Sequence, residues 1–218
     1  MIRFGFIYMV LGLLALTAEY VRKSIQDLYL EKQNELLHFN ENISEKVLLD
    51  SLTGAYNRGF LTELFPGLLQ FASDADTPLT ILLCDIDQFK VVNDLNGHVQ
   101  GDRVLKTVAQ LFIDNLRNAT DNLVRYGGDE FMIVLRNAEL EGAANLAERL
   151  RINIENLTFA EMDKGITCSF GVAELKPTDF EEEGELAAVQ LVARADKCLY
   201  QAKHQGKNQV VAQCSSIQ

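Results

Sequence analysis

Acidic residues gather at two places in this 218-residue chain where they could support chemistry. The first is the end of the apolar run 79–86, where Asp85 and Asp87 stand one residue apart. Alternation along a strand would place both carboxylates on the same face if the strand continues that far. Carboxylate oxygens at a strand end suit Mg²⁺, which often shares its ligands with phosphates. The alternative is a solvated strand end whose aspartate caps the next helix.

The second acidic pair follows two glycines, in the run Arg125-Tyr126-Gly127-Gly128-Asp129-Glu130-Phe131. β-Prone segments at 122–126 and 130–135 flank the Gly-Gly pair, a pattern typical of a β-hairpin. The glycines permit positive φ and leave room for a ligand to approach the backbone. Carboxylates clustered in this way raise one another's pKa, and a cation relieves the repulsion. Phosphoryl transfer requires such a cation, whereas an ordinary hairpin with solubilising acids is the alternative.

Two further groups of polar residues could bind a nucleotide. Asn93 and Asp102, with His98 between them, could hydrogen-bond the edge of a guanine, because an aspartate accepts from its N1–H and exocyclic amine. Lys203 and Lys207 lie at the end of a helical segment and could neutralise phosphates. Ordinary helix boundaries are the alternative for both groups, since glycine ends helices and cations favour helix C-termini.

The composition limits the class of partner. A formal net charge of −11 argues against nucleic acid, because a phosphate backbone is bound by a basic surface. Hydrophobic residues make up 48% and charged residues 23%, so a packed core is expected rather than global disorder. The four cysteines form no CxxC pair and none lies at metal-ligand spacing from a histidine. The pattern therefore fits reduced cytosolic thiols better than a disulfide framework.

Residues 1–21 are predicted to form a membrane anchor helix. Residues 4–18 carry no charge, and with their neighbours they approach the length of about 20 residues that a membrane span needs. Arg22 and Lys23 follow directly, which favours a cytoplasmic side for the rest of the chain. A signal peptide is an alternative, but no small-x-small cleavage site follows the run. A buried or interfacial helix is the third possibility.

Residues 22–49 are predicted to form a helical stalk. The segment has no Gly or Pro, and one apolar stripe recurs at spacings of three and four residues: Ile25, Leu28, Leu36, Phe39, Ile43 and Val47. Such a stripe must pack on something. A short coiled coil between two copies of the chain would bury it, and a helix packed on its own domain is the alternative.

Residues 50–218 are predicted to form one domain of the α+β class. Pro66 should interrupt the first helix, 58–71. The remaining elements are expected at 79–86 (strand), 99–118 (helix), 122–135 (hairpin), 139–157 (helix), 166–174 (strand), 185–205 (helix) and 208–212 (strand). This order is typical of a mainly antiparallel sheet covered by helices.

Five motifs along this domain carry a family resemblance when they are taken together. They are Asp50-Ser51-Leu52-Thr53-Gly54-Ala55-Tyr56-Asn57-Arg58, Asp85-Ile86-Asp87-Gln88-Phe89-Lys90-Val91-Val92-Asn93-Asp94, Gly97-His98-Val99-Gln100-Gly101-Asp102, the hairpin run 125–131, and Ala195-Asp196-Lys197-Cys198-Leu199-Tyr200-Gln201-Ala202-Lys203. In this order they make the segment from Asp50 to about Val211 resemble the GGDEF-domain diguanylate cyclases of bacteria.

The resemblance implies a fold and a reaction. It implies a five-stranded, ferredoxin-like sheet of the palm type found in polymerases and nucleotide cyclases. Each protomer would bind one GTP, and a homodimer would join two GTP molecules into cyclic di-GMP and release two pyrophosphates. Mg²⁺ (or Mn²⁺) is the implied cofactor. With the predicted anchor, the catalytic domain would lie in the cytoplasm at the inner membrane of a bacterium.

The resemblance also assigns roles by motif position. The metal would be held by Asp85, the Ile86 carbonyl, Asp129 and Glu130. The catalytic residues would be Asp129, as base for the 3′-hydroxyl, with Glu130 and Lys90. The substrate would be bound by Phe89, Asn93, His98, Asp102, Lys203 and Lys207.

Two departures from the family pattern stand out. The inhibitory product site of the family has an Arg-x-x-Asp just before the hairpin, and this chain has Asn118 and Asp121 at those positions. Asn118 lacks the guanidinium fork, and Arg117 is one position early and would point elsewhere on a helix. Weak or absent product inhibition is therefore expected. The usual Gly-Arg-Asn near the end is Gly206-Lys207-Asn208, which keeps the charge but not a bidentate contact.

Two other classes of function remain in competition with an enzyme. One is a catalytically inactive GGDEF-type module that binds a nucleotide or a partner. Such relatives usually lose the hairpin acids or the guanine-binding residues, and this chain has both. The other is a purely structural, membrane-tethered dimeriser, which leaves the clustered acids unexplained.

Overall fold

The computed structural model describes residues 22–23, 32, 48–117, 120–160, 162, 164–181 and 184–212. The chain divides into two units, Met1–Val47 and Leu48–Gln218. In the first unit, Arg22, Lys23 and Lys32 are helical and exposed. The predictions for residues 1–21 and for most of 22–49 fall outside the described residues. Within the ranges above, no helix combines the length and the apolar character that crossing a membrane requires.

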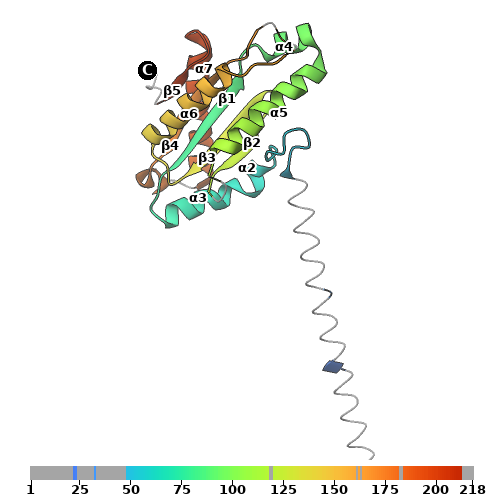
Figure 1. The fold of residues 1–218 in the computed structure, drawn as a ribbon. Coiled ribbons are helices and arrows are strands. Elements are labelled where there is room, and N and C mark those ends of the chain that lie inside the picture. Colours follow the sequence, from blue (N-terminus) through green and yellow to red (C-terminus); the bar gives the residue numbers. More distant parts are fainter. Residues whose placement is uncertain are drawn as a thin grey trace, which may run out of the picture. The chain divides into compact units, whose positions relative to one another are not determined.

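The second unit is built on a five-stranded mixed sheet (Figure 1). Its strands are β1 (Leu79–Ile86), β2 (Asn122–Arg125), β3 (Glu130–Arg136), β4 (Cys168–Leu175) and β5 (Val210–Ala212). Their order across the sheet is β2-β3-β1-β4-β5. β4 and β5 are parallel, and the other three pairings are antiparallel. The prediction of a mainly antiparallel, five-stranded α+β sheet is confirmed.

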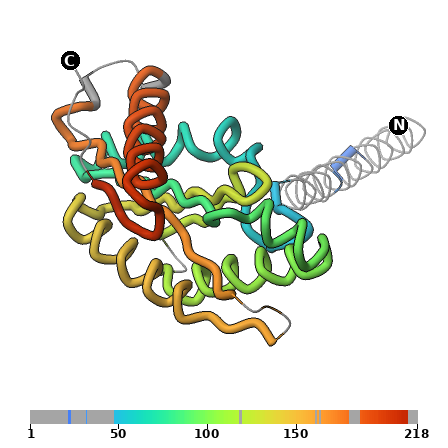
Figure 2. Tube along the Cα trace, turned by 90° about the horizontal axis from the view of Figure 1, so that it is seen from above, coloured from blue at the N-terminus to red at the C-terminus, as the bar shows by residue number. Residues whose placement is uncertain are grey.

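Helices cover both faces of the sheet (Figure 2). One face carries α5 (His98–Asn115) and α6 (Leu140–Glu155). The other carries α7 (Gly184–His204) together with α2 (Phe60–Glu63) and α3 (Phe65–Asp74). Because both faces of β1 are buried, its sequence is apolar at almost every position instead of alternating.

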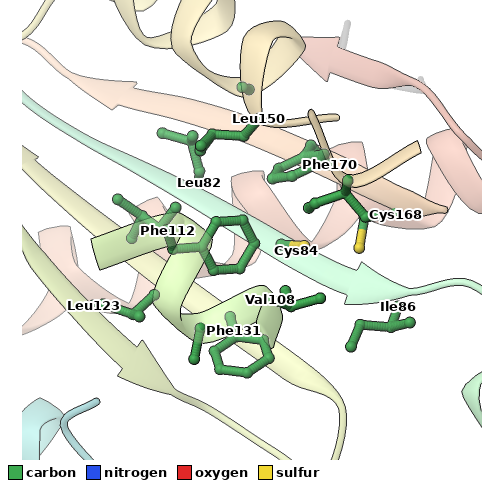
Figure 3. Packing of buried hydrophobic residues seen from close by; sticks show 14 of the residues in the cluster. Leu82, Cys84, Ile86, Val108, Phe112, Leu123, Phe131, Leu150, Cys168 and Phe170 are labelled. Carbon is green, nitrogen blue, oxygen red and sulfur yellow. The ribbon is translucent and has the colours of Figure 1, made fainter. Parts of the chain in front are cut away.

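The core between the sheet and α5 is centred on aromatic side chains (Figure 3). Phe112 of α5 meets Phe131 of β3 and Phe170 of β4 edge to face, with ring centroids 5.5 and 6.2 Å apart. All three rings are fully buried. This packing fixes α5 against the middle of the sheet, and α5 begins at the residues that were predicted to bind a base.

The observed helices differ from the predicted ones where a helix is too short to show the helical period in the sequence. The expected helix 58–71 is divided at Leu64 into α2 and α3, and Pro66 lies in the first turn of α3, as a proline favours. A further helix, α4 (Phe89–Asn96), precedes α5 and is joined to it at Gly97, whose φ is 80°. Eight residues are too few to show a helical period in sequence. A short 3₁₀ helix, Pro177–Glu181, was not expected either.

The contact between α7 and β4 leaves no room for a side chain at Gly171. A Cβ atom there would overlap the backbone of Ala195 and Leu199 in α7. Gly171→Ala is therefore expected to lower the free energy of unfolding by about 3 kcal/mol, since neither backbone can give way. Urea unfolding of both proteins measures this difference.

Gly142→Ala is the matched control, because the space around Gly142 on α6 is open. It should change the stability by less than about 1 kcal/mol, in the stabilising direction. Equal stability of the two alanine variants would contradict the close packing of α7 against β4 at Gly171.

Candidate active site

The hairpin tip between β2 and β3 is held by backbone and guanidinium hydrogen bonds. The amides of Tyr126 and Gly127 donate to the Glu130 carbonyl at 2.9 and 3.2 Å. Arg125 donates to the Gly128 carbonyl at 2.7 Å and pairs with Asp50 at 3.0 Å. The tip is therefore fixed both within the hairpin and to a residue 75 positions earlier.

The two glycines of the tip act through space rather than through backbone conformation. Neither Gly127 nor Gly128 has a φ in the left-handed region, so the hairpin does not use the positive φ that glycine permits. A Cβ at Gly127 would meet the Glu130 carboxylate, whereas the space around Gly128 is open. Gly127 thus lets Glu130 fold back over the turn, and Gly128 leaves the backbone accessible, as predicted.

Asp85 and Glu130 lie directly opposite each other on β1 and β3. Opposite residues of an antiparallel pair point to the same face, with Cβ atoms about 5 Å apart. The Ile86 amide donates to the Asp129 carbonyl at 3.3 Å, so the hairpin tip stays attached to the end of β1. The predicted metal ligands are thereby brought to one edge of the sheet. Lys203 of α7 reaches the same edge and pairs with Asp85 at 2.7 Å.

The end of the sheet at Asp85, Asp129 and Glu130 carries an excess of negative charge, and we call it the acidic edge. Burial, together with the nearby charges of Asp129 and Glu130, raises the pKa of Asp85 from 3.8 to about 6, although Lys203 lowers it. The Asp85 side chain is only 13% exposed, so solvent does little to relieve the repulsion. One lysine does not compensate for the group, and a further cation would be bound favourably here.

The donor set fits a hard divalent cation in its chemistry. The candidate ligands are all oxygens, which Mg²⁺ prefers, and nucleotide phosphates commonly complete its shell. No group of three or more His, Cys, Asp or Glu side chains in the described ranges is close enough to enclose a metal ion by itself. The protein groups would therefore supply part of a coordination shell, as at sites that share the metal with a substrate.

Asp87 does not join Asp85 at the candidate metal site, as the Asp-x-Asp spacing suggested. β1 ends at Ile86, and the Asp87 carboxylate is buried. It accepts hydrogen bonds from the Thr167 and Ser169 hydroxyls at 2.7 and 2.8 Å. A third comes from the Asn208 amide at 3.0 Å. Asp87 is not a solvated helix cap either, because Gln88 is the N-cap of α4.

A cavity of about 470 Å³ opens beside the hairpin tip. It is lined by residues of α4 and α5 and of the hairpin: Phe89, Lys90, Asn93, Asp94, His98, Asp102, Leu105, Arg125, Gly128 and Asp129. Six of these were predicted as site residues, and the structure brings them together. Asp94, Leu105 and Arg125 lie within or next to the predicting motifs but had been given no role.

Asn93 reaches this cavity region because α4 packs very closely on α5. At Gly101 the Asn93 side-chain oxygen and the Phe89 ring fill the space that a Cβ atom would need. The close approach brings Asn93 of α4 beside Asp102 of α5, in the arrangement expected for two side chains that bind one base.

A larger cavity, of about 860 Å³, lies at the opposite end of β1. Its lining includes Pro78, Glu139, Glu174 and Lys176, and none of the predicted site residues. Size alone would favour this cavity. The smaller one combines acidic, basic and amide side chains from three motifs at the hairpin tip, and we therefore place the site there.

The two late lysines follow different elements. Lys203 is in the last turn of α7 and is ion-paired with Asp85, as described above. Lys207 lies in the turn between α7 and β5 and has a φ of 65°. Lys203 therefore stands beside the end of β1. The turn that carries Lys207 also contacts α6, because Asn208 bonds Arg151 and Glu155.

The region before the hairpin differs from the predicted helix. α5 ends at Asn115, so Arg117 is not on a helix as expected. Its guanidinium pairs with Asp121 at 2.8 Å and donates to the Arg136 carbonyl at 2.9 Å. The Asp121 carboxylate is only 3% exposed. Asn118 lies outside the described residues.

Comparison with known proteins decides the family. The family profile described as "Diguanylate cyclase, GGDEF domain" matches residues 47–209. The chain belongs to the GGDEF-domain diguanylate cyclase family. The GGDEF domain here is 38% identical to the diguanylate cyclase DosC of Escherichia coli (strain K12), over 79% of this chain and 36% of DosC. The probable diguanylate cyclase DgcT of the same strain is 38% identical, over 80% of this chain and 37% of DgcT.

The chain therefore spans little more than a third of the length of these curated relatives. Solved GGDEF structures share its fold. The coiled coil and GGDEF domain of DgcB from Caulobacter crescentus, in complex with c-di-GMP, has a TM-score of 0.71 at 28% identity and covers 88% of this chain and 98% of that one. Diguanylate cyclase SiaD from Pseudomonas aeruginosa, in complex with its activator SiaC, has a TM-score of 0.73 at 29% identity and covers 97% and 82%.

The crowded carboxylates should make the metal-free GGDEF domain less stable. Because the pKa of Asp85 is raised to about 6, the folded state binds its proton more tightly than the unfolded state. Stability from this group is then present at low pH and is lost as the pH rises through about 4 to 6. Asp85→Asn should therefore stabilise the metal-free protein at pH 7.5 by about 1–2 kcal/mol, allowing for partial solvent screening.

Thermal unfolding in a chelator at pH 7.5 and pH 4 measures this effect, and the gain should disappear at pH 4. Asp196→Asn on α7 removes one exposed negative charge and is the matched control. Loss of stability in Asp85→Asn at pH 7.5 would mean that the Lys203 pair outweighs the repulsion.

Proposed function

We propose that the chain is an active diguanylate cyclase, which condenses two GTP into cyclic di-GMP and two pyrophosphates at the interface of a homodimer. One observation carries the proposal: the hairpin-tip acids lie between the partly buried carboxylate of Asp85 and a cavity lined by Asn93 and Asp102. Base-binding groups on one side and charge-binding groups on the other match the two ends of a nucleoside triphosphate.

The cavity between α4, α5 and the hairpin would take the guanine. Asn93 and Asp102 would hydrogen-bond the base edge, because an amide and a carboxylate together match the guanine acceptor and donors. Phe89 and His98 would border the base. Lys90 projects into the same cavity and would meet the phosphate that follows the sugar.

The phosphates would lie along the acidic edge with a divalent cation. Asp85, the Ile86 carbonyl, Asp129 and Glu130 would hold Mg²⁺ (or Mn²⁺), which when bound neutralises the phosphate oxygens. Lys203 and Lys207 approach this edge from α7 and its turn and would add positive charge. Asp129 would accept the proton of the 3′-hydroxyl as this oxygen forms its bond to the α-phosphorus of the other GTP. Pyrophosphate leaves as that bond forms.

Two copies of the chain are needed because each site holds one GTP. A symmetric face-to-face dimer places the 3′-hydroxyl of each nucleotide against the α-phosphate of the other. The stalk 22–49 would raise the local concentration of the second half-site by pairing. The solved DgcB structure contains a coiled coil together with its GGDEF domain. Residues 1–21 would anchor this pair to the inner membrane, with the GGDEF domains in the cytoplasm.

Incubating the full chain with GTP and Mg²⁺ should yield cyclic di-GMP, identified by mass spectrometry. Asp129→Ala should lower the turnover by at least about 10²-fold, because charge stabilisation in the transition state is lost. Circular dichroism checks that the variant is folded. Asp196→Asn serves again as the control for the loss of one carboxylate.

A verified dimer that binds GTP and forms no cyclic di-GMP would reject the enzyme. That outcome would instead support the inactive module, which binds GTP without converting it.

Product inhibition through the region before the hairpin should be weak. Asn118 has no guanidinium, and the Arg117 guanidinium is engaged by Asp121 and by the Arg136 carbonyl. Added cyclic di-GMP should therefore inhibit the wild-type chain only at high concentration, and Asn118→Arg should strengthen the inhibition about tenfold or more, by supplying a bidentate contact. Inhibition curves measure both. Tight inhibition of the wild type that Asp121→Ala abolishes would contradict this expectation.

A further inference from the structure

The turn between α7 and β5 is held in a conformation that its residues do not favour. Gly206, Lys207 and Asn208 have φ of 122°, 65° and 46°. Two consecutive non-glycine residues in the left-handed region are uncommon, and the surrounding contacts must compensate for their strain. Lys207, the candidate phosphate-binding lysine, is the middle residue of this turn.

Contacts on both sides of Lys207 hold the turn. The Lys207 amide donates to the Ala202 carbonyl of α7 at 3.0 Å. The next amide, that of Asn208, donates to the buried Asp87 carboxylate at 3.0 Å. The Asn208 side chain accepts from Arg151 and donates to Glu155, each at 2.8 Å. Lys207 is thus tied to α7 before it and to the end of β1 after it.

Asp87 is the central contact because it joins three segments. Its carboxylate accepts from the turn at Asn208 and from Thr167 and Ser169 at the start of β4. Asp87 is also two residues beyond Asp85, which pairs with Lys203. Lys203 and Lys207 are the two ends of the segment 203–207. The strand end that carries the candidate metal ligand therefore fixes both ends of the segment that carries the two lysines.

We propose that Asp87 is a positioning residue, which sets the distance of Lys207 from the acidic edge by holding the backbone of the Gly206–Asn208 turn. The proposal rests on the proposed function, because it assumes that Lys207 meets the phosphates of GTP. Asp87 itself would contact neither metal nor substrate in this role. Its carboxylate accepts hydrogen bonds from Thr167, Ser169 and Asn208, and its effect on the substrate would pass through Lys207.

The test is a double-mutant cycle on the affinity for GTP, measured by calorimetry on the full chain with Mg²⁺ and with 3′-deoxy-GTP as the probe, which keeps the base and the phosphates but lacks the hydroxyl that reacts. Asp87→Asn keeps the side-chain volume but loses the charge and one acceptor. It should weaken GTP binding about tenfold, the value of one charge-assisted hydrogen bond. Lys207→Gln should have a similar effect. The double variant should be little weaker than either single variant, because both remove the same contact.

GMP is the control ligand, because it lacks the terminal phosphates. Its affinity should change less than about twofold in Asp87→Asn. Thr167→Val is the control variant: it removes one hydrogen bond to the same carboxylate and leaves the Asn208 amide bonded. It should lower the melting temperature without changing GTP affinity.

Hydrogen exchange gives a readout that does not depend on GTP. Amides at 206–209 should exchange faster in Asp87→Asn than in the wild type or in Thr167→Val. Unchanged exchange there, additive effects of Asp87→Asn and Lys207→Gln, or an equal loss of GMP affinity would each overturn the proposal. A wild-type chain that binds GTP without forming cyclic di-GMP would reject the enzyme, while the cycle would still decide the role of Asp87.

Discussion

The candidate site depends on the antiparallel register between β1 and β3. In this register Asp85 lies opposite Glu130, and the Ile86 amide bonds the Asp129 carbonyl just beyond the paired residues. A slip by one residue would turn every side chain of one strand to the other face. Such a slip is opposed on both sides, because β1 is packed against α5 and α6 on one face and against α7 on the other. The apolar cores on the two faces of the sheet therefore fix the positions of the acids, which repel one another.

The same register creates an electrostatic cost. The Asp85 carboxylate is only 13% exposed, and Lys203 offsets only part of the repulsion from Asp129 and Glu130, since the pKa of Asp85 is still raised to about 6. Apolar packing elsewhere in the domain must carry this cost, which is common at sites built to bind a charged ligand. Additional positive charge at this edge would relieve the repulsion. Strained φ at Lys207 and Asn208 adds a second local cost at the same edge.

Much of the fold was predictable, and the exceptions have physical causes. β1 was predicted with its observed bounds, because a strand buried on both faces is a continuous apolar run. α4 was missed because eight residues of mixed polarity show no period. The cavity beside the hairpin tip was anticipated only as a set of motif residues, since the close approach of α4 and α5 at Gly101 is visible only in three dimensions. Arg117 was placed on a helix that ends two residues earlier. The hydrogen bonds of Asp87 join it to residues 80 and 121 positions away, which no local pattern can indicate.

Arg125 shows how one side chain can connect the start of the domain to the hairpin tip. Its guanidinium donates to the Gly128 carbonyl and to both oxygens of Asp50. Burial raises the pKa of Asp50, but hydrogen bonds from Thr53 and the Arg125 charge lower it by more, so the carboxylate stays ionised and keeps its hold on the arginine. A lysine could not replace this arrangement, because a single ammonium group lacks the planar fork that reaches two acceptors in fixed directions. Gly128, which lines the cavity beside the hairpin tip, is therefore linked through one guanidinium to Asp50 at the start of the domain.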